Sequence, residues 1–143
     1  MTRHKVEPKS IGEREDALAE LNEFILNHIR YEDNFVVIRM VVSQQTPMNT
    51  EKELKPSSSQ ALFRKITESF RKSVRSEDYV GKLSIDEYII IIKDNNPATG
   101  SLVANRLSRI VSDTTNGTFI GRTYVTAYQE GDTPQDILER VMH

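Results

Sequence analysis

The 143-residue sequence contains no cysteine and no tryptophan, and only 6 glycines and 5 prolines. Without cysteine there is neither a disulfide framework nor a thiolate metal site, which fits a reducing compartment. The formal net charge is only −2, so no global positive field exists to attract nucleic acid or an anionic membrane. The longest apolar runs lie within residues 35–42 and 88–92 and are far too short to span a bilayer. We therefore expect no nucleic-acid binding and no membrane insertion by this chain.

The remaining composition is typical of a globular domain. The chain is 37% hydrophobic and 28% charged, and its length suffices for one domain with a real core. The N-terminus has no apolar signal-peptide core, which favours a cytoplasmic location. We expect residues 1–9 to be a flexible segment and residues 10–143 to form the single domain.

Hydrophobic periodicity predicts alternating helices and strands. Ser10 and Glu13 resemble a capping box ahead of a helix that ends near Arg30, with Ile29 on its apolar face. Asn96 and Thr133 are each followed by proline, the pattern of an N-cap and first helical residue. The other expected elements are a buried strand at 35–42, a polar loop at 43–57, a helix at 58–74, a hairpin of strands 79–83 and 87–93, and a strand at 118–129.

The order of these elements predicts an α/β fold with a single mixed β-sheet flanked by helices, built on a ferredoxin-like βαββαβ core. Leu102 is expected on the apolar face of the third helix. The residues expected in the core between sheet and helices are Ile66, Phe70, Ile90, Leu107 and Val125. Such an order is shared by many nucleotide-handling domains and fixes no function.

One stretch carries a family resemblance. Residues 75–88 read RSEDYVGKLSIDEY, which resembles the signature of the GGDEF (diguanylate cyclase) family, where an RxxD pair precedes a strand and then the GGDEF hairpin. The gap of five residues between Asp78 and Ser84 matches the family spacing. Residues 16–21 resemble a degenerate form of the family's opening motif. Residues 123–127 and 133–138 resemble its late strand and its last helix. The resemblance covers residues 16–142 and implies a nucleotide-cyclase-like fold for the domain at residues 10–143.

The departures from the family pattern imply a degenerate active site. Ser84 and Ile85 stand where two glycines let the backbone approach phosphates, and Ser43 stands where an acidic residue binds Mg²⁺. The family's guanine contacts correspond to Glu51 and Gln60.

Two further positions of the active-site pattern, Asp86 and Glu87, keep their carboxylates. With metal, phosphate and base contacts compromised, the resemblance implies a protein without catalytic residues and without a metal or other cofactor. His4, His28 and His143 have no metal-ligand spacing, so no metal site is expected.

A second family site is matched in type and spacing. Arg75, Asp78 and Arg106 correspond to the family's inhibitory site for cyclic di-GMP. An arginine can donate two hydrogen bonds to guanine O6 and N7, and a carboxylate can accept from N1 and N2. The leading hypothesis is therefore a non-catalytic cyclic di-GMP receptor that signals to an effector protein or a neighbouring domain. Because this ligand presents two guanines, it could bridge two copies into a homodimer.

Two alternatives stay open. In the first, Arg75 and Asp78 have a purely structural role: they cap a helix end and hold the hairpin by a salt bridge. Arg106 then faces solvent. The domain would then be a ligand-independent dimerisation or docking module. A residual GTP-binding or weak cyclase activity would instead rest on Asp86 and Glu87. The basic residues of segment 58–74 are expected to form a solvated helix face, not a nucleic-acid patch.

Overall fold

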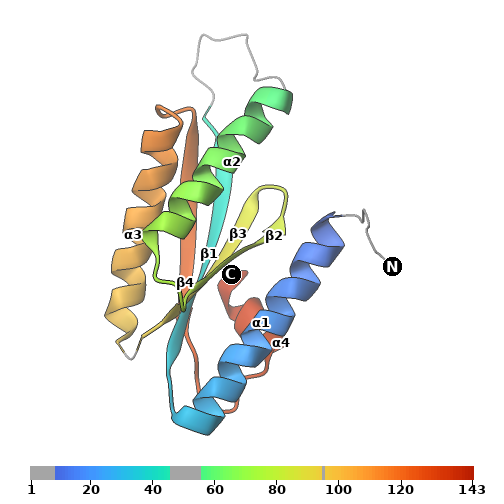
Figure 1. Ribbon diagram of the computed structural model, residues 1–143, viewed down its shortest axis with the longest axis vertical. Helices are drawn as coiled ribbons and strands as arrows, with labels where there is room; N and C mark the ends of the chain where they lie inside the picture. The colour runs from blue at the N-terminus through green and yellow to red at the C-terminus, as the bar shows by residue number, and fades with distance from the viewer. Residues whose placement is uncertain (1–8, 46–55, 95) are drawn as a thin grey trace.

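A computed structural model describes residues 9–45, 56–94 and 96–143 of the chain (Figure 1). The predicted alternation of helices and strands is confirmed throughout these residues. The elements are α1 (Lys9–Tyr31), β1 (Phe35–Gln44), α2 (Pro56–Ser73), β2 (Tyr79–Ser84), β3 (Glu87–Lys93), α3 (Pro97–Thr114), β4 (Phe119–Ala127) and α4 (Pro134–Val141). None of the described helices combines the length and apolar character that crossing a bilayer requires.

The start of the chain differs slightly from the prediction. Helix α1 begins at Lys9, so Ser10 lies within the helix and is not its N-cap. The flexible segment predicted for residues 1–9 otherwise falls outside the described residues. So does most of the loop predicted at 43–57, while its first residues extend β1 as far as Gln44.

The four strands form one sheet in the order β2-β3-β1-β4, and every neighbouring pair is antiparallel. The prediction of a mixed sheet was wrong in this respect. Strands β1 and β2, joined through α2, are both antiparallel to β3, which lies between them, so the parallel strands never pair. This is the split βαβ arrangement of the ferredoxin-like core, and β1 separates β3 from β4 in the same way.

Helices cover both faces of the sheet, so alternate residues of β1 enter two different cores. Ile38 packs with Phe70 of α2 and Leu107 of α3 on one face. Val37 packs with Leu21 of α1 and with α4 on the other face. Burial on both faces explains why β1 and β3 read as nearly continuous apolar runs.

The core prediction is confirmed at four positions and wrong at the edge of the sheet. The four residues that are fully buried are Ile66, Phe70, Ile90 and Leu107. Val125, however, is 37% exposed, because β4 is an edge strand. Leu102 of α3 and Ile29 of α1, both expected on apolar helix faces, are 69% and 68% exposed.

Two helix starts follow the predicted capping chemistry. The Asn96 side chain accepts a hydrogen bond from the Ala98 amide at 3.0 Å and caps α3. The Thr133 hydroxyl accepts from the Asp136 amide, and the Asp136 carboxylate accepts from the Thr133 amide, which completes a capping box on α4.

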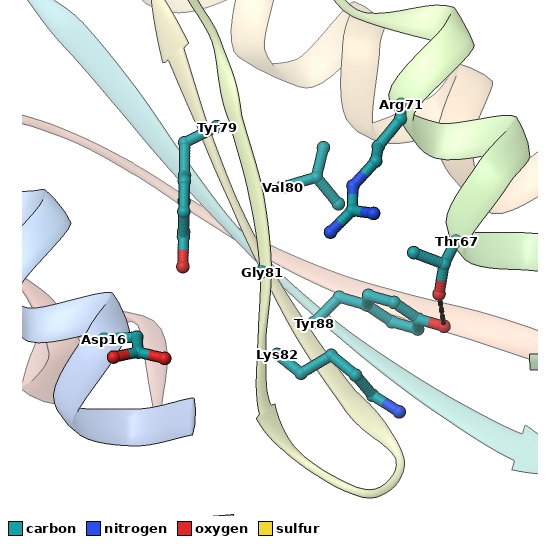
Figure 2. Close-up of a pocket in the computed structure, with 8 residues that line it drawn as sticks. All are labelled: Asp16, Thr67, Arg71, Tyr79, Val80, Gly81, Lys82 and Tyr88. Carbon is teal, nitrogen blue, oxygen red and sulfur yellow. Dashed lines mark hydrogen bonds between the residues drawn. The ribbon is translucent and has the colours of Figure 1, made fainter. Parts of the chain in front are cut away.

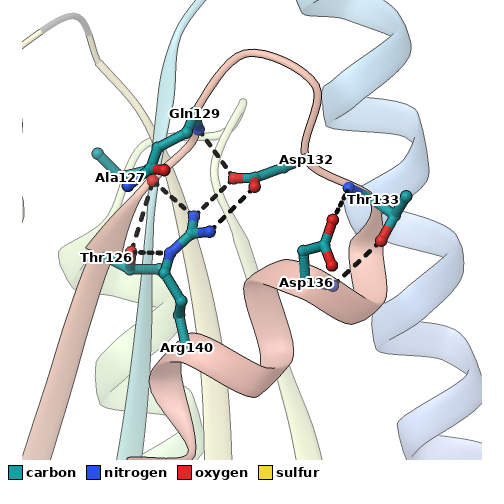
Figure 3. A network of polar contacts seen from close by, with 7 residues as sticks. All are labelled: Thr126, Ala127, Gln129, Asp132, Thr133, Asp136 and Arg140. Atoms are coloured by element: carbon teal, nitrogen blue, oxygen red, sulfur yellow. Dashed lines mark hydrogen bonds and ion pairs between the residues drawn. The ribbon is translucent and has the colours of Figure 1, made fainter.

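An arginine network docks α4 against the end of β4 (Figure 3). The Arg140 guanidinium donates to both carboxylate oxygens of Asp132, at 2.9 and 2.6 Å, to the Thr126 hydroxyl at 2.9 Å and to the Ala127 carbonyl at 3.1 Å. The hydrogen bonds from Arg140 hold the pKa of Asp132 below its ordinary value, against the opposing effect of burial. The same bonds raise the pKa of Arg140.

Candidate functional site

Most of the site residues singled out from sequence fall at the two ends of the β2–β3 hairpin. The closed end is the turn at residues 84–87 together with the neighbouring end of β1. The open end is the segment 73–78 that leads from α2 into β2, together with Lys93 at the end of β3. The Val42 amide donates to the Asp86 carbonyl at 2.9 Å, which places the turn beside the last residues of β1.

The turn at the closed end is built for residues that carry a Cβ. Ser84 and Ile85 both keep a negative φ, so neither position requires glycine. The Ser84 hydroxyl donates to the Asp86 carboxylate at 3.0 Å, and Ile85 is 77% exposed at the tip. A turn with two side chains and an internal hydrogen bond presents no bare backbone surface to a phosphate group.

Glu87 is engaged in an ion pair inside the fold. The Arg39 Nε donates to its carboxylate at 3.1 Å, with only 12% and 22% of the two side chains exposed. The same guanidinium lies 5.1 Å from the centre of the Tyr124 ring and donates to the Val141 carbonyl at 3.4 Å. Sequence reasoning missed Arg39, although it is the single charged residue of β1, and a charge in such a strand calls for a partner.

The remaining active-site positions do not assemble into a metal site. Ser43 is exposed near the end of β1, opposite Ile120 of β4. Gln60 is exposed on α2 and has no hydrogen bond or ion pair with the closed end in the described structure. No group of three or more metal-ligating side chains occurs among the described residues. Glu51 lies outside them.

Asp78 holds together the two segments of the open end. Its side chain is only 2% exposed, and its two carboxylate oxygens accept from the Arg75 and Lys93 amides, both at 2.9 Å. This carboxylate therefore joins the exit of α2 to the last residue of β3. Because both oxygens already accept backbone amides and only 2% of the side chain is exposed, the expected contact with guanine N1 and N2 does not fit this arrangement.

Arg75 is half exposed and lies over the same junction. Its Nη2 donates to the Lys93 carbonyl, and its Nε lies 3.6 Å from the Asp78 carboxylate and 3.7 Å from Glu77. Among the described residues, Nη1 of Arg75 has no hydrogen-bond partner. One edge of the guanidinium thus holds the fold together, and the other stays available.

Arg106 reaches the same helix end from α3. Its Nε donates to the Ser73 hydroxyl and its Nη2 to the Ser73 carbonyl, both at 2.8 Å. The second bond gives the carbonyl of the last residue of α2 a hydrogen-bond donor. Arg75, Asp78 and Arg106 therefore all lie around the C-terminal end of α2. All three also have structural contacts there.

Two shallow pockets follow β2 away from the open end. The first, about 310 Å³, is lined by Arg71, Val74, Arg75, Ser76, Asp78, Tyr79 and Val80. The second, about 280 Å³, shares Arg71, Tyr79 and Val80 and extends to Lys82 and Asp16 (Figure 2). Figure 2 shows Arg71 reaching toward β2 from α2, with Tyr79 and Asp16 on the opposite side of the strand.

Gly81 allows the Tyr79 ring to lie against β2. A Cβ at Gly81 would come within 2.3 Å of the Tyr79 hydroxyl and 2.6 Å of its ring. The ring therefore covers the backbone of Gly81, an arrangement that any larger residue would displace. The basic residues of α2 expected to face solvent do so; they are Arg64, Lys65, Arg71 and Lys72.

Comparison with known proteins identifies the fold. No protein-family model and no curated protein matches this chain. Solved structures do, among them a microbial GGDEF domain described in its interaction with bis-(3′,5′)-cyclic di-GMP, with a TM-score of 0.76 and 13% identity over 90% of this chain and 81% of that one.

Two further structures show the same likeness. The active GGEEF domain of a diguanylate cyclase from Vibrio cholerae gives a TM-score of 0.74 and 14% identity, over 90% of this chain and 85% of that one. The diguanylate cyclase SiaD from Pseudomonas aeruginosa, in complex with its activator SiaC, gives 0.73 and 15%, over 90% of this chain and 51% of that one. The chain therefore has the fold of GGDEF domains.

Proposed function

We propose that this chain is a non-catalytic regulatory domain that binds cyclic di-GMP at the open end of the β2–β3 hairpin. The observation that carries the proposal is that Arg106 of α3 bonds Ser73, two residues before Arg75, and that Arg75 lines a pocket of about 310 Å³ beside this end of α2. Two guanidinium groups at one helix end suit a ligand with two phosphates and two guanines. The similar structure described with cyclic di-GMP supports the choice of ligand.

In this proposal Arg75, Arg106 and Asp78 have roles that differ from those expected from the sequence. Arg75 contacts the ligand through its exposed edge, donating to guanine O6 and N7 or to a phosphate oxygen. Arg106 adds a second positive charge. Asp78 acts as a positioning residue, because its buried carboxylate holds the α2 exit against β3 and so sets the place of Arg75.

The absence of catalysis is proposed from the closed end. Phosphoryl transfer by this kind of domain depends on metal ions held by carboxylates, with a backbone that can approach the phosphates. Here Glu87 is paired with Arg39, Asp86 accepts from Ser84, and Ser43 offers only a hydroxyl. We expect no cyclic di-GMP from GTP and Mg²⁺, measured by chromatography of the reaction, and metal-dependent product above background would contradict this.

Calorimetric titration of the full chain with cyclic di-GMP tests the binding proposal. We expect saturable heat from the unmodified protein and from Asp86→Ala, and at least a tenfold weaker affinity for Arg75→Ala. Light scattering of the same samples shows whether the two guanines bridge two copies. If saturating ligand gives neither heat nor a shift in melting temperature, the binding proposal is wrong.

One observation favours a second candidate, a docking module that needs no ligand. Every member of the matched triad already has a protein partner: Asp78 the two amides, Arg75 the Lys93 carbonyl and Arg106 Ser73. The likeness to a cyclase solved with a protein activator supports a protein partner in general. A negative titration combined with capture of a defined effector would select this candidate.

A further inference from the structure

The pocket beside Arg75 has room for only part of a cyclic dinucleotide. Its volume of about 310 Å³ lies at the lower end of the range for small-molecule sites, roughly 300–1,000 Å³. In its extended form, cyclic di-GMP has two guanines at opposite ends of a ring that carries both phosphates. One guanine and part of the ring fill such a pocket, so the other half of the ligand needs a surface next to it.

A second pocket continues from the first along β2. The two pockets share Arg71, Tyr79 and Val80, and the second, about 280 Å³, extends to Lys82. Val80 belongs to the core beneath α2 and α3. Lys82, two residues later in the strand, points to the same face of the sheet. Together the two pockets form a groove between α2 and β2, which leads away from the open end of the hairpin.

Arg71 lies where the two pockets meet. It is exposed on α2, and Figure 2 shows its guanidinium reaching toward β2 beside Val80. Arg75 uses part of its guanidinium on the Lys93 carbonyl and lies beside the Asp78 carboxylate. Arg71, by contrast, makes no hydrogen bond or ion pair with any described residue. Its whole guanidinium can therefore donate to a phosphate, with two parallel hydrogen bonds.

Aromatic rings hold the Lys82 ammonium at the far end of the second pocket. Its Nζ lies 5.1 Å from the centre of the Phe63 ring and 5.4 Å from the centre of the Tyr88 ring. Cation–π contacts of this kind fix the position of an ammonium without neutralising its charge. No carboxylate of the described residues lies within ion-pair distance of it. The ammonium is therefore a positioned donor, and guanine O6 and N7 are matching acceptors.

The hydroxyl groups near Lys82 are already engaged within the protein. The Thr67 and Tyr88 hydroxyls lie 2.7 Å apart, and they approach the Phe63 carbonyl at 2.9 and 3.2 Å (Figure 2). Both hydroxyl hydrogens thus have acceptors inside the fold. Recognition of a ligand in this pocket depends on the charged side chains.

The carboxylates that line the two pockets leave the α2 side of the groove positive. Asp78 is buried, and its oxygens accept from two backbone amides. Asp16 lies on the opposite side of β2 from Arg71, as Figure 2 shows. The α2 side of the groove therefore presents Arg75, Arg71 and Lys82 in succession. This order suits a ligand with acceptor groups at both ends and negative charge in the middle.

We propose that one cyclic di-GMP molecule lies along β2 and fills both pockets of a single domain. One guanine lies at Arg75, the phosphates of the ring lie at Arg71, and the O6 and N7 atoms of the second guanine accept from Lys82. This inference rests on the proposed function and adds Arg71 and Lys82 as binding residues. Because one copy then binds both guanines, the ligand does not bridge two copies of the chain.

Ligand stoichiometry and molecular mass test the inference with the unmodified chain. We expect calorimetry to give one cyclic di-GMP per chain, and light scattering to give the same protein mass before and after saturation. Two ligands per chain, or a dimer that forms only with ligand, would overturn the inference. The proposed function would stand in either case, because both results still require binding.

Two variants test the contacts themselves. Arg71→Ala and Lys82→Met should each weaken cyclic di-GMP binding about fivefold or more, because each removes a charge-assisted contact. Methionine keeps an apolar chain against the two aromatic rings, so Lys82→Met removes the charge with little loss of packing. The matched control is Lys72→Ala, which removes an exposed charge beside Arg71 from a residue that lines neither pocket. Its affinity should change less than about twofold. Thermal melting shows whether each variant is folded.

The variants also separate this inference from the function on which it rests. Arg75→Ala could weaken binding while Arg71→Ala and Lys82→Met behave like Lys72→Ala. The ligand would then bind at the open end without entering the second pocket, and the inference would be wrong. If the unmodified chain binds no cyclic di-GMP at all, the inference and the proposed function are both wrong.

Discussion

The two ends of the β2–β3 hairpin show how differently one fold can retain polar residues. At the closed end, Ser84, Ile85 and Asp86 form a self-contained turn in which two of the three side chains face water. At the open end, the Asp78 carboxylate is buried and bonds two backbone amides, and Arg75 lies across the same junction. The polar side chains of the open end hold the fold together, whereas at the closed end only Glu87 does so, through its ion pair with Arg39. Residue identity alone does not separate these two situations.

The largest expected effect is on stability at the open end. Asp78→Ala removes a buried carboxylate that bonds the Arg75 and Lys93 amides, and we expect the free energy of unfolding to fall by about 2–4 kcal/mol. Urea denaturation followed by circular dichroism measures this. A loss below about 0.5 kcal/mol would mean that Asp78 does not join the two segments.

Arg75 separates a binding role from a structural one. Its loss removes a charge-assisted contact, so Arg75→Ala should make the binding free energy of cyclic di-GMP less favourable by about 1–3 kcal/mol. The affinity should fall roughly tenfold or more. The control is Arg109→Ala, which removes an exposed arginine from α3, one turn beyond Arg106. Equal affinities for the two variants, measured by calorimetry, would place the ligand elsewhere or show only a general charge effect.

Asp132 extends the comparison to a third carboxylate with structural partners. Its pKa is lowered in the folded protein by Arg140, so its contribution is present above the ordinary aspartate pKa and is lost as pH falls through the lowered one. Asp132→Asn should therefore cost about 1–2 kcal/mol at pH 7 and less at acid pH. Denaturant midpoints across this range measure it, and a cost that does not change with pH would contradict the assignment.

The smallest effect is expected at the closed end. Asp86 is exposed, and its side chain bonds only the neighbouring Ser84 hydroxyl among the described residues. Asp86→Ala should change the free energy of unfolding by less than about 0.5 kcal/mol. It should also leave cyclic di-GMP affinity unchanged. A large loss of affinity would show that the turn, not the open end, holds the ligand.

Local chemistry made much of the fold predictable. The prolines after Asn96 and Thr133 marked the two helix starts, and the apolar runs marked the two central strands, since each signal acts within a few residues. The antiparallel sheet order was not predictable in this way. It depends on β3 lying between β1 and β2, and on β1 lying between β3 and β4. Val125 was misassigned for the same reason: its exposure follows from the edge position of β4, which a local pattern does not contain.

The family resemblance pointed to Arg75, Asp78 and Arg106, but not to their contacts. The structure places Arg75 and Asp78 just after α2, and the Arg106 guanidinium on Ser73, the last residue of α2. The bond that Asp78 accepts from the Lys93 amide depends on the path of β3 and spans 15 residues. The pairing of Arg39 with Glu87 spans 48 residues. Neither hydrophobic periodicity nor a short motif indicates contacts between residues so far apart in the sequence.

Mapping cyclic di-GMP by amide chemical shifts tests the central claim most directly, since it reports where the ligand lies. The account predicts that the largest shifts on titration fall at residues 73–79, at Lys93 and around Arg106, and that residues 84–87 barely change. Shifts concentrated at residues 84–87 and at the end of β1, or no shifts at saturating ligand, would contradict the account.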